Sequence, residues 1–172
     1  MESFGTDRIF GAAWCKVGES MAITYSRMII GVLTASLFTI SESNAAESNN
    51  YISEAIDAAQ HGNCAKAFTL LDRAKAKAPD DYRVYYVAGM TYLRCGKTAQ
   101  GKSYLEKGIG LAGRMAVQDK YTKGNIAVAY ASLGNYPRAR LYAEEAKKLF
   151  SDAGDSTEVD KMNAFLLNIS NQ

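Results

Sequence analysis

Several residue types are scarce in this sequence, and each shortage argues against a class of function. Histidine occurs once and cysteine three times in 172 residues, whereas a structural zinc site usually takes four ligands and a Cys/His nucleophile also needs an orienting group. The carboxylates fall in expected helical surface positions or turns rather than in the sheltered, opposed pairs that hydrolysis requires. We therefore expect no catalytic residues, no metal site and no cofactor, and the chain is not predicted to be an enzyme.

The sequence also lacks an excess of charge of either sign. It has 20 Lys and Arg against 18 Asp and Glu, for a formal net charge of +2. The charges are mixed along the chain, as where Lys147 and Lys148 follow Glu144 and Glu145, so there is no basic stripe of the kind that phosphate backbones require. Nucleic acid is not an expected partner.

Proline occurs only twice, and 48% of the residues are hydrophobic and 22% charged. This composition, rich in Ala, Lys, Glu and Leu, is typical of a folded helical protein and argues against a disordered one. A chain of this length is expected to form a single domain with its own core.

No apolar run reaches the roughly 20 residues that span a bilayer. The longest, Met28–Ile40, has 13 uncharged residues, follows Arg27 and precedes the polar stretch SESNAAES. A basic, then apolar, then small-residue order is typical of a secretory signal peptide. We predict a signal peptide at residues 21–46, cleaved after Ala45 or Ala46, with no membrane span after cleavage.

This interpretation leaves the start of the chain open. Residues 1–20 are either an upstream extension or untranslated, since Met21 is a second candidate start. The pattern predicts a bacterial protein that is periplasmic or secreted, with membrane anchoring through an uncleaved signal as the alternative.

An internal repeat is the strongest pattern in the chain. Gly62, Gly96 and Gly134 are spaced by 34 and then 38 residues, and an insertion around Arg114–Gln118 accounts for the longer interval. Small and aromatic residues keep the same offsets in four further columns: Ala55, Gly89 and Ala127; Ala67, Gly101 and Ala139; Ala74, Gly108 and Ala146; Ala58, Tyr92 and Tyr130.

These columns resemble the tetratricopeptide repeat, a 34-residue unit of two antiparallel helices with small residues where the helices cross. The likeness covers about residues 48–150 and is clearest in GNIAVAYASLGNYPRARLYAEEAKKLF, from Gly124 to Phe150. It implies an all-α fold, a short right-handed α-solenoid. Residues 47–154 would form three helix pairs, at about 48–81, 82–115 and 120–153.

Residues 155–172 are predicted to form a capping helix and a tail. Val159, Met162, Leu166 and Ile169 share one helical face, and Asp155 can cap the helix, with Glu158 three residues later. Such a helix would cover the apolar face of the third pair.

One apparent motif is rejected by its context. Residues 108–113 read GIGLAG, the glycine spacing of a dinucleotide-binding turn, but that turn follows a strand, whereas KSYLEK before it is helical. Because a glycine inside a helix costs about 1 kcal/mol relative to Ala, we expect Gly101, Gly108 and Gly110 to make this the softest helix.

The resemblance gives Cys64 and Cys95 a specific relation. It places Cys64 at the start of one helix and Cys95 at the end of its antiparallel neighbour, so a disulfide between the first two repeats is one hypothesis in an exported protein. Two buried, unbonded thiols are the alternative. His61, the single histidine, is expected to interact with a helix C-terminus.

Members of this family bind partners along the inner face of the first helix of each pair, which implies a concave face that holds a protein or peptide. Tyr, Met and Arg are enriched at interfaces, and Arg can hold a carboxylate, so a peptide or helix with an acidic feature would fit. The residues predicted to bind the partner are Arg83, Tyr86, Met90, Arg94, Tyr121, Asn125 and Val128, with Ile52, Ile56 and Gln60 from the first pair.

Other assignments remain open for the same residues. Tyr86 and Met90 can instead pack against neighbouring helices. In place of an adaptor, the chain can be a structural scaffold that self-associates end to end, or a small-ligand sensor with a pocket near His61 and Cys64.

Overall fold

The computed structural model describes residues 35–172, with side chains from residue 43 onward. The chain divides into two units, residues 1–43 and residues 44–172, and the packed helices belong to the second. The predicted upstream extension (residues 1–20) and most of the predicted signal peptide (residues 21–46) lie outside the described residues.

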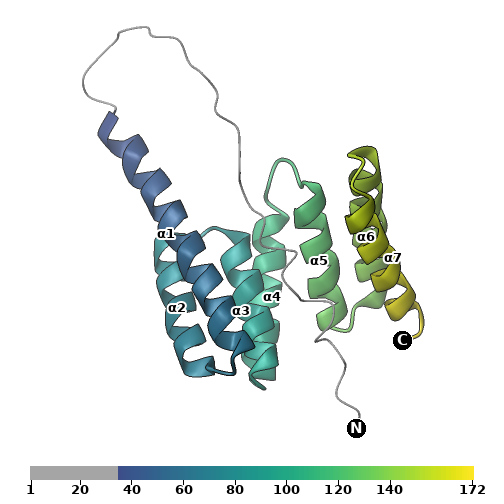
Figure 1. The fold of residues 1–172 in the computed structure, drawn as a ribbon, viewed down its shortest axis with the longest axis horizontal. Coiled ribbons are helices and arrows are strands. Elements are labelled where there is room, and N and C mark those ends of the chain that lie inside the picture. The colour runs from purple at the N-terminus through teal and green to yellow at the C-terminus, as the bar shows by residue number, and fades with distance from the viewer. Residues whose placement is uncertain (1–34) are drawn as a thin grey trace, which may run out of the picture. The chain divides into compact units, whose positions relative to one another are not determined.

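All regular secondary structure in residues 35–172 is helical. Figure 1 shows the helices of residues 44–172 following one another in the order of the sequence. Three successive pairs, α1 with α2, α3 with α4 and α5 with α6, are followed by α7. The expected all-α solenoid of helix pairs with a C-terminal helix is thereby confirmed. The elements are α1 (Ala35–Gln60), α2 (Cys64–Lys77), α3 (Tyr82–Arg94), α4 (Thr98–Ala112), α5 (Lys120–Ser132), α6 (Tyr136–Asp152) and α7 (Ser156–Ser170). None of these helices is both long enough and apolar enough to cross a bilayer.

The recurring glycines form the turn inside each helix pair. Gly62, Gly96 and Gly134 have φ of 74°, 74° and 78°, a left-handed conformation that side chains disfavour. In each turn the next N–H donates to the carbonyl five residues earlier, at 2.8 Å, which satisfies the end of the preceding helix. Gly154, with φ of 71°, makes the same kind of turn between α6 and α7, which the repeat pattern does not reveal.

Short polar side chains fix where the next helix begins. Each accepts a hydrogen bond from a backbone N–H in the first turn, which pairs a donor that the helix itself leaves unsatisfied. The α4 helix has no such side-chain cap and begins after Lys97. The capping residues are Asn63, Asp81, Asp119, Asn135 and Asp155.

Small residues form the core where the helices cross. Ala55, Ala67 and Ala74 are completely buried, as are Ala139 and Ala146 in the third pair. Because these side chains are short, the helix axes approach closely, and large side chains fill the remaining space. Those that are most fully buried include Leu71, Leu105 and Phe150.

The α3 and α4 helices approach each other closely at two glycines. A Cβ atom on Gly89 would lie 2.6 Å from Leu105 Cδ2 and 3.0 Å from the Gly101 carbonyl oxygen. One on Gly101 would lie 2.7 Å from Leu93 Cγ and 2.9 Å from the Gly89 carbonyl oxygen. These two glycines are therefore packing residues. Within α4, Gly110 has no atom near such a Cβ, so its cost is that of helix propensity alone.

The α7 helix covers the third pair with a face shifted from the predicted one. Asp155 caps it by accepting from the Glu158 N–H, as expected. The buried side chains are Glu158, Met162, Phe165 and Ile169, whereas Val159 and Leu166 stay partly exposed. The buried face is shifted because the large Phe165 ring, which was not among the predicted core residues, is turned toward the core.

Candidate partner-binding face

The predicted binding residues lie on the first helix of the second and third pairs. Arg83, Tyr86, Met90 and Arg94 belong to α3, and Tyr121, Asn125 and Val128 belong to α5. From the first pair, Ile52 is buried, Ile56 is partly buried and Gln60 is exposed on α1. The structure thus gives these residues very different accessibility.

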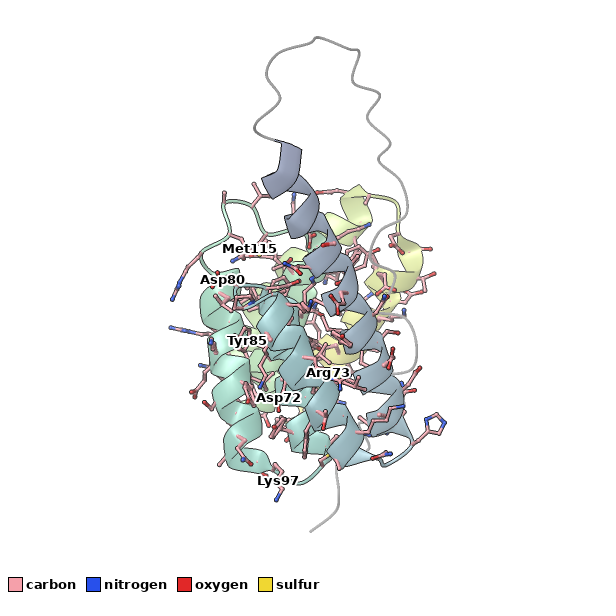
Figure 2. The ribbon with its side chains drawn as sticks, turned by 90° about the vertical axis from the view of Figure 1, so that its left-hand side faces the viewer. Asp72, Arg73, Asp80, Tyr85, Lys97 and Met115 are labelled. Carbon is pink, nitrogen blue, oxygen red and sulfur yellow. A yellow bond between two sulfur atoms is a disulfide. The ribbon has the colours of Figure 1, made fainter. Side chains whose placement is uncertain are left out.

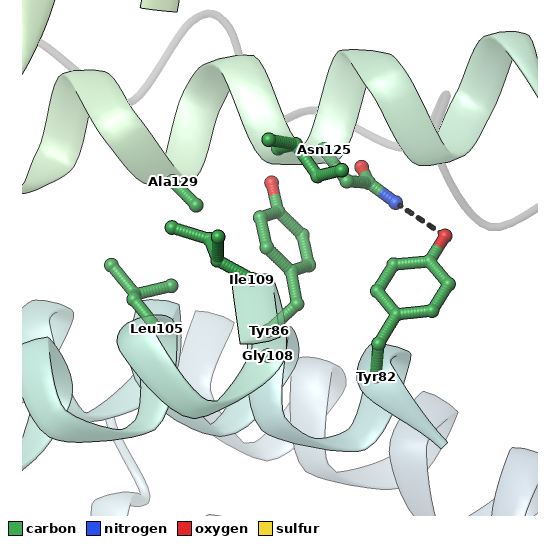
Figure 3. Close-up of a pocket in the computed structure, with 8 residues that line it drawn as sticks. Tyr82, Tyr86, Leu105, Gly108, Ile109, Asn125 and Ala129 are labelled. Carbon is green, nitrogen blue, oxygen red and sulfur yellow. Dashed lines mark hydrogen bonds between the residues drawn. The ribbon is translucent and has the colours of Figure 1, made fainter. Parts of the chain in front are cut away.

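Tyr86 and Asn125 face one another across the junction between the second and third pairs. Both line a small cavity of about 10 Å³, and Figure 3 shows the Tyr86 ring pointing toward α5 between Ile109 and Asn125. Burial raises the pKa of the Tyr86 hydroxyl above its ordinary value. Tyr86 is partly exposed, and its ring lies at the junction between the second and third pairs.

A polar cluster at this junction was not visible in the sequence. The Tyr82 hydroxyl and Thr122 Oγ1 lie 3.0 Å apart, and Asn125 Nδ2 donates to the same hydroxyl at 3.5 Å. Burial is the main cause that raises the pKa of Tyr82, and the two hydrogen bonds oppose it. The buried Asn125 Oδ1 has no hydrogen-bond partner in the structure. The cluster joins α5 to α3.

Met90 and Val128 are also involved in helix packing. Met90 Sδ accepts a hydrogen bond from Ser132 Oγ at 3.7 Å, and Val128 keeps only 7% of its surface exposed. Met90 remains partly exposed beside that contact. Tyr121 is also partly exposed, with its ring edge-on to Phe150 at a centroid distance of 5.3 Å.

The two arginines of α3 differ in their exposure to solvent. Arg83 is held by Asp81, the residue that caps its own helix: Nε donates to both carboxylate oxygens at 3.0 Å and Nη2 donates to Oδ2 at 2.6 Å. A partner carboxylate at Arg83 would compete with Asp81. Arg94 is exposed at the last turn of the helix, so it is the more accessible cation of the predicted set.

A disulfide joins the first and second pairs. Cys64 and Cys95 are bonded, with their Cα atoms 6.1 Å apart, so the structure has a bond where two free thiols were the alternative. One helical turn further along, Phe68 and Tyr92 stack with their ring centroids 4.1 Å apart. We name the disulfide and this ring pair the first seam.

Further contacts extend the first seam to α4. Tyr92 packs against Tyr104, with ring centroids 5.0 Å apart. Lys75 Nζ donates to the Tyr104 hydroxyl at 2.8 Å and lies 4.5 Å from the centroid of that ring. The second and third pairs meet without such a covalent link, so the two junctions of the solenoid are chemically unlike.

His61 lies at the exposed C-terminal end of α1. Its Nδ1 is 2.8 Å from the Asp57 carbonyl oxygen, which fits the expected interaction with a helix end. Cys64 is in the disulfide, so it offers no thiol for a site with His61. Among the described residues, no three His, Cys, Asp or Glu side chains are grouped so as to hold a metal ion.

Comparison with known families gives one match. The family model of the tetratricopeptide repeat matches residues 82–114, which include α3, α4 and the turn between them. No curated protein matches the chain. The chain therefore carries a tetratricopeptide repeat within a stack of similar helix pairs, and repeats of this kind are typically interaction modules without enzymatic activity.

Proposed function

We propose that this protein is an exported adaptor that holds a protein partner, in an envelope assembly or a secretion system, along the face made by α1, α3 and α5. The repeat at residues 82–114 carries this proposal, because such repeats suggest a protein-binding adaptor. The stack supports it, since successive helix pairs repeat the same surface along one direction.

The accessible part of this face defines what the partner must match. Gln60 and Arg94 are exposed at the last turns of α1 and α3, and Met90 and Tyr121 are partly exposed. A cation beside a thioether and an aromatic ring suits a peptide or helix that has an acidic residue next to an apolar one. Tyr86, Asn125 and Val128 contribute indirectly, because they set the position of α5 against α3.

A capture experiment tests this proposal. The chain from Glu47 onward is used to capture proteins from the native envelope fraction, and captured proteins are identified by mass spectrometry. The test variant is Gln60→Ala with Arg94→Ala, which changes two exposed residues of the proposed face. The matched control is Lys102→Ala with Ser103→Ala, which changes two exposed residues on the second helix of the second pair.

We expect one partner to bind the unchanged chain and the control but not the test variant. Tyr86→Ala is unsuitable here, because it removes a ring from the junction between pairs. Equal loss in both double variants, or undiminished capture by the test variant, would show that the partner binds elsewhere.

Export is supported by two features of the described residues. Disulfides such as Cys64–Cys95 persist mainly in oxidising compartments. In addition, Ser48 is the first completely buried residue, and its hydroxyl donates to the Ala74 carbonyl oxygen at 3.3 Å. Cleavage after Ala45 or Ala46 would remove no buried side chain of the second unit.

Fractionation and N-terminal sequencing of the native protein test this part. We expect a soluble envelope protein that begins at Ala46 or Glu47. A chain that retains residues 21–46 and sediments with the membrane would instead establish the anchored alternative.

End-to-end self-association is less well supported, because it needs an uncovered apolar surface at the end of the stack. At the C-terminal end, α7 buries Met162, Phe165 and Ile169 and leaves Asp160 and Asn163 exposed. Of its large hydrophobic side chains only Leu167 is mostly exposed, at 69%. We expect a monomer in sedimentation velocity across a wide concentration range. A concentration-dependent increase in mass would favour the scaffold.

A further inference from the structure

The first junction, between the first and second pairs, has a covalent connection at each end of its helices. At one end the chain itself passes from α2 to α3 through residues 78–81. At the other, the disulfide joins Cys64, the first residue of α2, to Cys95, which follows α3. Figure 2 shows Asp80 near the first of these ends and Lys97, two residues after Cys95, near the other. The first and second pairs are therefore fixed to each other at both ends.

The second junction, between the second and third pairs, differs at one of its ends. Its chain connection, residues 113–119, contains Met115, which lies at the same end of the helices as Asp80 (Figure 2). At the other end the repeat offsets of 34 and 38 residues place Thr98 and Leu133 where the first junction has its cysteines. Thr98 is the first residue of α4, and Leu133 follows α5. We call this the unlinked end, because these two side chains cannot form a disulfide.

Hydrogen bonds at the second junction are stronger near the chain connection than near the unlinked end. Tyr82 and Thr122, in the first turns of α3 and α5, have their hydroxyl oxygens 3.0 Å apart. In the last turns of the same two helices, Ser132 Oγ donates to Met90 Sδ at 3.7 Å, and a thioether sulfur is a weak acceptor. The contacts between α3 and α5 thus weaken toward the unlinked end.

The aromatic stack of the first seam is not repeated at the second junction. Phe68 of α2 stacks on Tyr92 of α3, and the repeat offsets make Lys102 and Tyr130 the equivalent residues. Lys102 is exposed and brings no ring to Tyr130. The Tyr130 ring stacks instead on Tyr142 of its own pair, with centroids 5.6 Å apart.

Packing inside the second junction is incomplete. The cavity of about 10 Å³ lies between α3, α4 and α5, and the side chains around it lose the contacts that a filled core would supply. The buried Asn125 Oδ1 has no hydrogen-bond partner in the structure, which destabilises the closed junction, since the same oxygen would bind water if the helices moved apart. Both features lower the free energy needed to separate α5 from α3 and α4.

The third pair and α7 are joined so that they would move as one body. The ion pair of Lys123 with Glu145 links α5 to α6. Lys120 Nζ of α5 lies 3.5 Å from Oδ2 of Asp155, the residue that caps α7. The two bodies on either side of the second junction are therefore α1 to α4 and α5 to α7.

We propose that the solenoid opens at the second junction: the helices separate at the unlinked end, and α5 to α7 rotate about residues 113–119. Loop segments of this kind absorb the backbone changes of hinge motions. The same motion is prevented at the first junction by its two covalent connections. Opening changes the spacing of α3 and α5 beside Met90 and Arg94. This inference does not depend on the proposed adaptor function.

Methyl relaxation-dispersion NMR tests the proposal, because it detects exchange on the microsecond to millisecond timescale of hinge motions. The sample is the oxidised full chain with Cys15→Ser, so that the third cysteine cannot pair. The reporters at the second junction are the methyl groups of Met90 and Ile126. Those of Leu71 and Val84, in the cores that join α1, α2 and α3, report on the first junction.

We expect an exchange contribution to relaxation at Met90 and Ile126 and flat profiles at Leu71 and Val84. Flat profiles at all four residues would overturn the proposal, because they would show that the second junction does not open on this timescale. Equal exchange at both junctions would also overturn it, because the disulfide would then make no difference to the motion.

A second disulfide at the unlinked end provides the matched comparison. Thr98→Cys with Leu133→Cys reproduces the position of the native bond, and Thr98→Ser with Leu133→Ser alters the same residues without a bond. Peptide mapping shows whether positions 98 and 133 are joined and the native disulfide is intact. We expect the bonded variant to lose the exchange at Met90 and Ile126 and the serine variant to keep it. Exchange that persists in the bonded variant would refute separation at this end, and if the new bond does not form, the profiles of the unaltered junction decide.

Discussion

Substitution of the α4 glycines by alanine separates helix propensity from packing within one helix. Gly110→Ala adds a methyl group where no atom lies within 4 Å, so it should gain the full propensity difference of about 1 kcal/mol. For a domain of this size we expect a rise in melting temperature of about 3 to 5 °C.

Gly101→Ala should have the opposite effect. Its Cβ would lie 2.9 Å from the Gly89 carbonyl oxygen, and because that atom is backbone, α3 and α4 must move apart. Overpacking of this kind costs about 1 to 3 kcal/mol, which equals or exceeds the propensity gain. We expect a net loss of up to about 2 kcal/mol relative to the unchanged chain.

Gly108→Ala should fall between these two. Its Cβ would lie 3.2 Å from the Tyr86 backbone nitrogen, so a shift of a few tenths of an ångström suffices. The three variants are compared by urea unfolding, followed by circular dichroism at the helical band. If Gly101→Ala stabilises the protein as much as Gly110→Ala does, this result would contradict the close approach of α3 and α4 at Gly101.

Two further predictions concern the first pair. Cys95→Ser opens the disulfide that bridges 31 positions, so the free energy of unfolding should fall by about 3 to 4 kcal/mol in the chain-entropy model; an unchanged urea midpoint relative to the oxidised protein would contradict this. Glu47 receives a hydrogen bond from Lys77 and one from Tyr51, which lower the pKa of its carboxyl group. Its contribution is therefore present above the unfolded pKa and is lost as the pH falls through the folded one. Glu47→Gln should lower the melting temperature at neutral pH but not at acid pH, and a difference that persists in acid would exclude the ion pair as its source.

The repeat was predictable from the sequence because its residues act through the backbone. Gly62, Gly96 and Gly134 recur since each turn needs a left-handed residue, with φ of 74°, 74° and 78°. The crossing alanines recur since the helix axes must approach closely. Both requirements depend on position along the chain alone, so spacing reveals them.

The contacts of the predicted binding face could not be predicted from the spacing of residues along the chain. Whether Tyr86 points into the junction or out to a partner depends on how the α3 and α5 helices are rotated about their axes, which long-range packing decides. The Tyr82–Thr122 pair, separated by 40 positions, has no local signal at all. The predicted buried face of α7 contained Leu166, whereas the structure buries Phe165. Both residues are suited to a core, and the rotation of α7 about its axis, which long-range packing decides, selects between them.

The course of α1 also bears on the cleavage proposed above. Asn44, Ala45 and Ala46 are part of this helix, but proteases generally bind their substrates in an extended form, so a cut at this place needs the first turns of the packed segment to be unwound. If the proposed cleavage takes place, it would therefore compete with the docking of Ser48 against Ala74. A chain that folds early would then protect the proposed cleavage site, and the rate at which the first pair assembles would set the time available for cleavage.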